Sequence, residues 1–170
     1  MAGTGEEQGH TGEPSPPEGV EVRRAEARDL PEIVALLADD PLGAGREDAS
    51  DLAPYRAAFA EIGADPNQFL AVAVRGDRVV GTLQVTFIPG LSRGAAKRAQ
   101  IEAVRVHRNE RGSGLGGHLM AWAEARAREA GCALVQLTSD RTRPDAHRFY
   151  ERLGYTPGHI GFKKPLPTSD

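Results

Sequence analysis

The segment with the clearest chemical character is a glycine-rich loop, Arg111-Gly112-Ser113-Gly114-Leu115-Gly116-Gly117. It comes shortly after a predicted strand and opens a predicted helix. Glycine lets a ligand approach the backbone closely, and the N–H groups in the first turn of a helix have no partner within the helix and attract anions. The loop therefore predicts a site for a phosphate group, with tight packing of a helix entry as the alternative.

The sequence just before this loop is basic. Residues 93–111 carry six basic side chains and two acidic ones, Glu102 and Glu110. Local positive charge of this kind favours an anionic ligand. The chain as a whole has a net charge of −3, however, which argues against a protein attracted to nucleic acid along its whole surface.

Two common nucleotide-binding folds are excluded. Gly112, Gly114 and Gly117 satisfy the pattern G-x-G-x-x-G, and Asp140 follows the next predicted strand. Only thirty residues remain after Asp140, which leaves no room for the further strand and helix units of a dinucleotide-binding fold. A Walker loop is excluded because G-x-x-x-x-G-K-[ST] does not occur.

The hydrophobic pattern predicts a single α/β domain in which strands and helices position this loop. We expect a first strand at 20–22, helices over 29–38 and 51–63, a hairpin of strands over 69–74 and 79–88, a strand over 100–106, a helix over 115–130, a strand over 132–138, a short helix over 145–153, and one or two final strands between 155 and 166.

Length and composition set the limits. The 170 residues fit one domain, 39% of them are hydrophobic, and no apolar run is long enough to cross a bilayer. Residues 1–19 contain five glycines, three prolines, four glutamates and no basic residue, which predicts a disordered tail before a domain over 20–170. No export signal is recognisable, so we expect a cytoplasmic protein without a membrane partner.

Two motifs, in order, resemble those of the GNAT superfamily of N-acetyltransferases. Residues 111–116, R-G-S-G-L-G, match the family pattern [QR]-x-x-G-x-[GA], and residues 145–155 resemble A-x-x-F-Y-x-x-x-G-[FY]. The resemblance covers about residues 20–166. It implies a mixed, twisted sheet of six to seven strands flanked by about four helices, and transfer of an acetyl group from acetyl-CoA directly to a primary amine.

The resemblance also implies which residues bind acetyl-CoA. The pyrophosphate would lie on the loop, at Arg111, Gly112, Ser113, Gly114, Leu115, Gly116 and Gly117. The pantetheine arm would pair with the backbone of Val104, Arg105 and Val106, and the Val104 N–H would donate to the thioester oxygen. We expect no metal, because the five histidines show no H-x-x-x-H or H-E-x-x-H spacing.

Two side chains match the family's catalytic positions. Glu102 would remove a proton from the attacking ammonium, and Tyr150 would protonate the departing thiolate. Strict alternation along 100–106 predicts that Glu102, Val104 and Val106 share one face. The alternatives are that Glu102 is a solvated strand residue and that Tyr150 only packs its helix, as we expect of Phe149.

The acceptor is less well defined by the sequence. Residues 29–65 contain nine acidic and two basic side chains, which would attract a cationic small amine unless they only cap helices or face solvent. A protein or peptide amine stays open as acceptor, and residues 145–155 also resemble aminoalkylphosphonate acetyltransferases. The rival functions are a non-catalytic acyl-CoA-binding module and a nucleotide or nucleic-acid binder that uses the basic segment 93–111; we expect no nucleic-acid partner. A homodimer stays open.

The sequence also allows specific predictions for Cys132 and Asp140. Cys132, the only cysteine, is predicted to be a buried structural thiol. Asp140 stands where relatives often have asparagine, and a carboxylate near the cofactor phosphates would be unfavourable. We therefore expect Asp140 to face away or to pair with Arg141 or Arg143.

Overall fold

The computed structural model describes residues 17–40, 43 and 45–167, and in it five strands form a single mixed sheet in the order β1-β2-β3-β4-β5. The first four strands pair antiparallel, and β5 lies parallel to β4. The strands are β1 (Val20–Arg24), β2 (Gln68–Arg75), β3 (Arg78–Ile88), β4 (Arg98–Val106) and β5 (Leu134–Leu137). Most of the predicted tail, residues 1–16, lies outside the described residues.

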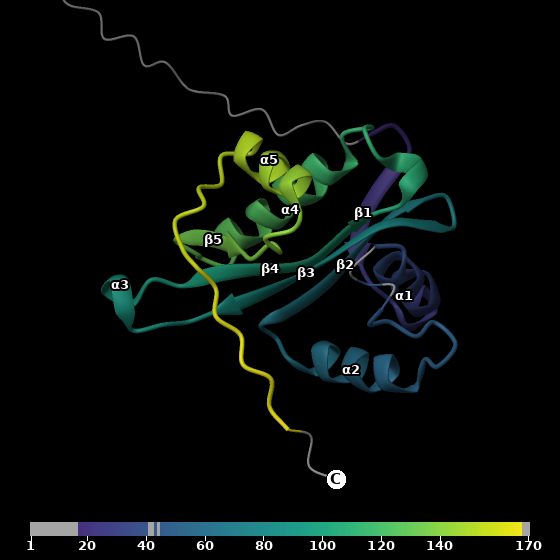
Figure 1. Ribbon diagram of the computed structural model, residues 1–170, viewed down its shortest axis with the longest axis horizontal. Coiled ribbons are helices and arrows are strands. Elements are labelled where there is room, and N and C mark those ends of the chain that lie inside the picture. The colour runs from purple at the N-terminus through teal and green to yellow at the C-terminus, as the bar shows by residue number, and fades with distance from the viewer. Residues whose placement is uncertain (1–16, 41–42, 44, 168–170) are drawn as a thin grey trace, which may run out of the picture.

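Helices cover both faces of the sheet. Figure 1 shows α4 and α5 on one face and α1 and α2 on the other, with α3 projecting from the connection between β3 and β4. Their bounds are α1 (Leu30–Ala38), α2 (Ala53–Ala64), α3 (Ser92–Ala95), α4 (Leu115–Glu129) and α5 (Pro144–Arg152). The predicted set of about four substantial helices is confirmed. None of the described helices is long and apolar enough to span a membrane.

The core is divided by the sheet into two apolar layers. Strand side chains alternate between faces, so neighbours such as Ala71 and Val72 enter different layers. The layer under α4 is completed by Leu115 and Leu119, which are fully buried. The layer under α1 and α2 is completed by Ile33. This packing holds the start of α4 firmly against β3 and β4.

A β-bulge interrupts β4. Glu102 lies opposite Gln84 and Arg105 opposite Thr82, so three steps along β4 match two along β3. Ala103, inside the bulge, has φ of 53°, a left-handed conformation that costs a non-glycine residue on the order of 1 kcal/mol. Val104 and Val106 consequently pack on the α4-side core. The prediction that Glu102 shares their face is wrong, because the extra residue reverses the alternation.

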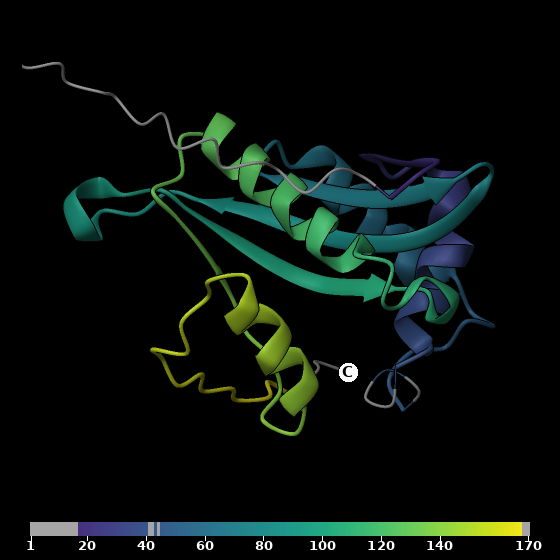
Figure 2. The ribbon, with the colours of Figure 1, turned by 90° about the horizontal axis from the view of Figure 1, so that it is seen from above.

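Strand β5 pairs with only the first half of β4. The pairs run from Arg98 with Leu134 to Ile101 with Leu137. After that the two chains diverge, and Figure 2 shows the segment after β5 leading away from β4 towards α5. The second half of β4, from Glu102 to Val106, therefore has a backbone edge that β5 does not cover.

The predicted strands between 155 and 166 are absent, and this corrects the expected six to seven strands to five among the described residues. Residues 156–167 are exposed and form neither helix nor strand. Prolines at 157, 165 and 167 have no N–H to donate, and glycines at 158 and 161 favour an irregular chain. Figure 1 shows this segment crossing the edge of the sheet from the α5 side to the α2 side.

A glycine on α4 lets α5 approach closely. A Cβ built on Gly116 would lie 3.2 Å from Cζ of Phe149, a closer contact than side chains normally make. On the next residue, Gly117, it would meet only Leu153 Cδ2, at 3.9 Å. Phe149 therefore packs as expected, and α5 takes its position from this contact.

Replacing Gly116 with valine should push Phe149 out of place. We expect Gly116→Val to lower the free energy of unfolding in urea by about 1–3 kcal/mol more than Gly117→Val does. The Gly117 variant is the matched control, because both changes alter helix propensity equally. Equal free energies of unfolding for the two variants would contradict the proposed close contact.

Candidate active site

The glycine loop has backbone donors that are ready for a ligand. Gly112 and Gly114 have φ of 84° and 88°, which only glycine adopts without strain. Ser113 Oγ donates to the Glu110 carbonyl at 2.7 Å. Within the described part of the chain, the N–H groups of residues 112, 114, 116 and 117 make no hydrogen bond. The loop thus has the donor set that a pyrophosphate needs.

The arginines beside the loop are tied to helix α1. Arg108 forms an ion pair with Asp39, and Nη2 of Arg111 lies 3.7 Å from the same carboxylate. The hydrogen bond from Arg108 is the main reason that the pKa of Asp39 lies below its usual value. Sequence reasoning did not predict this contact. It joins the end of α1 to the loop and neutralises part of the loop's positive charge.

The uncovered half of β4 runs up to this loop. Val104, Arg105 and Val106 lie beyond the last pair with β5, so an extended ligand could add to this edge as a strand would. The valine side chains pack on the core, and the Val104 carbonyl accepts a hydrogen bond from Nη1 of Arg105 at 2.9 Å. The backbone, and not the side chains, is therefore what Val104 and Val106 could offer a ligand.

Tyr150 lies on α5 in an aromatic cluster. Its ring centroid is 5.1 Å from that of Phe149 and 6.0 Å from that of Tyr155. Burial raises the pKa of Tyr150, although Arg143 and Arg105 act in the opposite direction. Among the described residues none hydrogen-bonds to its hydroxyl, whereas the Tyr155 hydroxyl donates to Glu124 at 2.9 Å. Tyr150 is thus the tyrosine of this cluster whose proton is available.

Two arginines and one buried aspartate lie close to Tyr150. Asp40 Oδ2, just after α1, is 3.0 Å from Nη2 of Arg105 and 3.5 Å from Nη1 of Arg143. Burial lowers the pKa of Arg105, and the charge of Asp40 opposes that change. We call these three residues the Arg–Asp–Arg cluster. From the sequence we predicted a role only for the backbone of Arg105. The contact of its side chain with Asp40, and that of Asp40 with Arg143, was not predicted.

Glu102 lies on a polar strip of the sheet. Its side chain is exposed, and its cross-strand neighbour is Gln84. Beside it, Gln136 Nε2 donates to Gln100 Oε1 at 2.8 Å. Strands β2 to β5 each contribute one glutamine to this strip: Gln68, Gln84, Gln100 and Gln136. The recurrence of glutamine on successive strands is visible in the sequence, but we did not use it. Glu102 and Tyr150 are not joined by a hydrogen bond among the described residues.

The acidic segment 29–65 is mostly engaged in structural contacts. Asp29 binds Arg23 at 2.7 Å, Glu47 accepts the Tyr55 hydroxyl at 2.7 Å, and Asp51 accepts the Ala53 N–H at 2.9 Å. Asp39 and Asp40 pair with arginines, as described above. These contacts favour the structural alternative over an acidic entrance for a cationic acceptor.

Two further expectations can be compared with the structure. Among the described residues the Asp140 carboxylate forms no ion pair with Arg141 or Arg143; its Oδ1 accepts the N–H and the hydroxyl of Thr142, at 2.9 and 2.7 Å, within its own turn. Cys132 is partly buried against the core, and burial raises the pKa of its thiol. Both observations agree with structural roles. Within residues 17–40, 43 and 45–167, no three His, Cys, Asp or Glu side chains gather as a metal site would require.

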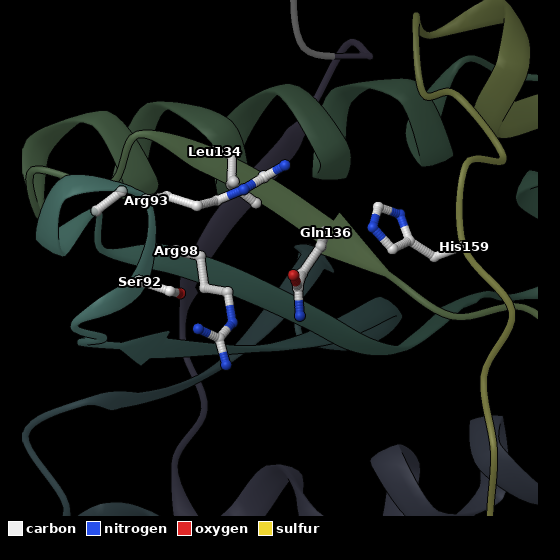
Figure 3. A pocket seen from close by; sticks show the side chains of 7 residues that line it. Ser92, Arg93, Arg98, Leu134, Gln136 and His159 are labelled. Carbon is white, nitrogen blue, oxygen red and sulfur yellow. The ribbon is translucent and has the colours of Figure 1, made fainter.

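A basic pocket lies at the other end of β4. Figure 3 shows its lining, and its volume is about 270 Å³. The residues that line it are Ser92, Arg93, Ala96, Arg98, Leu134, Gln136 and His159. Arg98 begins β4 and Val106 ends it, so about 26 Å of strand separates this pocket from the glycine loop. It is therefore distinct from the predicted cofactor site.

Comparison with known proteins gives consistent results. The model of the Acetyltransferase (GNAT) family matches residues 30–155. An aminoalkylphosphonate N-acetyltransferase of Salmonella typhimurium is 34% identical over 146 residues, which are 86% of this chain and 91% of that protein.

Solved structures share the fold. A protein from Bacillus halodurans described as a transcriptional regulator is 48% identical, with a TM-score of 0.83 over 86% of this chain and 99% of that one. An acetyltransferase from Trypanosoma brucei is 27% identical, with a TM-score of 0.68 over the same shares.

The protonation state of Tyr150 can be measured directly. Because burial raises its pKa, the neutral phenol is favoured, and we expect it to ionise with a midpoint above the ordinary value of about 10. The tyrosinate absorbance of the wild-type protein, minus that of Tyr150→Phe, isolates this one group as pH is raised. A midpoint below 10 would show that the arginines outweigh burial.

Proposed function

The chain belongs to the GNAT family of acetyltransferases, and on that premise we propose that it moves an acetyl group from acetyl-CoA directly to the primary amine of a small molecule. The observation that carries the proposal is the contact of Gly116 with Phe149. This contact joins the phosphate-binding loop to the helix of Tyr150, so that one packing interaction aligns cofactor binding with a proton donor.

Acetyl-CoA supplies an acyl group activated as a thioester. In our proposal its pyrophosphate accepts hydrogen bonds from the free N–H groups of the loop, and its pantetheine arm pairs with the uncovered edge of β4 at Val104, Arg105 and Val106. The residues fit this ligand because the loop leaves several donors unused. The Val104 N–H, next to the bulge, would stabilise negative charge that develops on the acyl oxygen.

Glu102 and Tyr150 move the protons. An amine is mostly protonated at neutral pH and must lose a proton before it attacks, and Glu102 would accept that proton through water, since its carboxylate is solvent-exposed. Tyr150 would donate its proton to the thiolate of the leaving group. Tyr150 is protonated at neutral pH, as a donor must be, and its hydroxyl has no hydrogen-bond partner among the described residues that would compete for the proton.

A small-molecule acceptor is supported by the name of the Salmonella relative, an aminoalkylphosphonate N-acetyltransferase that aligns with most of this chain. A protein or peptide amine is the competing acceptor. Both are tested by thiol release from acetyl-CoA over a panel of small amines, amino acids and peptides. Release with peptides alone would replace the small-molecule proposal, and tight acetyl-CoA binding without release would indicate a binding module.

Replacing Glu102 removes the proposed base. We expect Glu102→Gln to lower kcat at least about tenfold, or roughly 1.4 kcal/mol of barrier, in the thiol-release assay. Because the amine is mostly protonated below its own pKa and needs a base there, the loss relative to the wild type should be large at neutral pH and small above the pKa of the amine. Glu129→Gln, an exposed change on α4, is the control. A kcat equal to that of the control would exclude Glu102 as the base.

Replacing Tyr150 removes the proposed acid. We expect Tyr150→Phe to lower kcat at least about tenfold while the acetyl-CoA affinity changes little, because the ring remains. The matched control is Tyr155→Phe, which removes a hydroxyl that binds Glu124 and should reduce stability more than turnover. If the two variants lost the same activity, packing alone would explain the role of Tyr150.

A further inference from the structure

The Arg–Asp–Arg cluster is assembled from three distant parts of the chain. Asp40 follows α1, Arg105 lies on β4, and Arg143 immediately precedes α5. The side chain of Asp40 is only 6% exposed and that of Arg105 22% exposed. The bulge at Ala103 is what turns Arg105 to this side, away from the core that Val104 and Val106 enter.

The cluster has more positive charge and more donors than its single carboxylate satisfies. Two guanidinium groups share Asp40, and Nε of Arg105 is buried without a hydrogen bond to any described residue. The charge of Glu47 also raises the pKa of Arg105, but this is the smallest of the electrostatic effects on that pKa. The Glu47 carboxylate accepts a hydrogen bond from the Tyr55 hydroxyl. Arg105 is largely buried and Arg143 is 37% exposed, so an anion that reaches Arg143 from solvent would balance charge that Asp40 alone does not.

The cluster lies where an acceptor must come. Both arginines affect the pKa of Tyr150, so their charges are close to the proposed proton donor. Arg105 also directly follows Val104, whose N–H we propose beside the acyl oxygen. The cofactor phosphates have their own donors on the glycine loop. The excess charge of the cluster is therefore available to the second substrate.

We propose that Arg105 and Arg143 bind an anionic group of the acceptor, and that the acceptor is accordingly a compact amine that also carries a phosphonate or a carboxylate. Either group can accept paired hydrogen bonds from a guanidinium. Asp40, just after the end of α1, holds the two arginines in place through its ion pairs with them. This inference rests on the proposed acetyl transfer and specifies its acceptor.

The test compares acceptors that differ in charge. The thiol-release assay is run with 2-aminoethylphosphonate, with β-alanine and with the neutral β-alaninamide. We expect kcat/KM for the better of the two anionic amines to exceed that for the amide at least about tenfold. The two anionic compounds show which acid group the site prefers. Equal kcat/KM for all three would overturn the inference.

Arg143 is the residue to change, because it is more exposed than Arg105 and its replacement endangers the fold less. Arg143→Gln should raise KM for the preferred anionic amine at least about tenfold and leave kcat/KM for the amide within about threefold. Arg143→Lys keeps the charge without the paired geometry and should restore part of the preference. Arg148→Gln, at an exposed position of the helix α5 that follows Arg143, is the matched control and should behave as wild type. Equal losses for anionic and neutral acceptors in Arg143→Gln would contradict a charge-recognition role.

A separate measurement distinguishes failure of this inference from failure of the proposed function. If the wild type acetylates none of the amines, the proposed function fails, and calorimetric titration with 2-aminoethylphosphonate in the presence of CoA then tests the site alone. Binding that Arg143→Gln weakens at least about tenfold would support the anion site. No binding to the wild type, or equal binding to both proteins, would overturn it.

Discussion

One extra residue in β4 organises the site. The bulge at Ala103 leaves Val104 and Val106 in the core while it turns Arg105 towards Asp40. A regular strand would have placed Val104 on the exposed strip with Glu102 and driven Arg105 into the apolar layer under α4. The local cost of a left-handed alanine is therefore offset by the core contacts of two valines and by an ion pair that a straight strand could not make.

Helix α1 contributes to the site through charge. Consecutive aspartates after its last turn reach in two directions: Asp39 towards Arg108 and Arg111 beside the glycine loop, and Asp40 towards Arg105 and Arg143. The end of a single helix thus contacts both the arginines beside the glycine loop and the Arg–Asp–Arg cluster. Three of the nine acidic residues in 29–65, namely Asp29, Asp39 and Asp40, hold arginines in place.

Local patterns predicted most of the fold, and long-range contacts account for what they missed. Helical periodicity placed α4 at 115–130, against Leu115–Glu129 observed, and the hairpin predicted over 69–74 and 79–88 matches β2 (Gln68–Arg75) and β3 (Arg78–Ile88). Nothing local marks Ala103 as a bulge, since the register that creates it belongs to the pairing with β3. The Arg–Asp–Arg cluster was equally hidden, because its members lie at positions 40, 105 and 143. Strands were expected between 155 and 166, but the prolines of that segment lack an N–H to donate to a neighbouring strand, and its glycines add conformational freedom that disfavours a strand.

The contact between Gly116 and Phe149 also limits how the sequence can diverge. A Cβ at position 116 would lie 3.2 Å from Cζ of Phe149, so this ring must shift by a few tenths of an ångström to admit even a small side chain there. A bulkier residue at position 116 favours a smaller one at position 149, which would leave a gap beneath Tyr150, so we expect the two positions to change in a correlated way. Diversification of this enzyme towards new acceptors is thus directed away from the interface between α4 and α5, and towards the end of α1 and the exposed strip of the sheet.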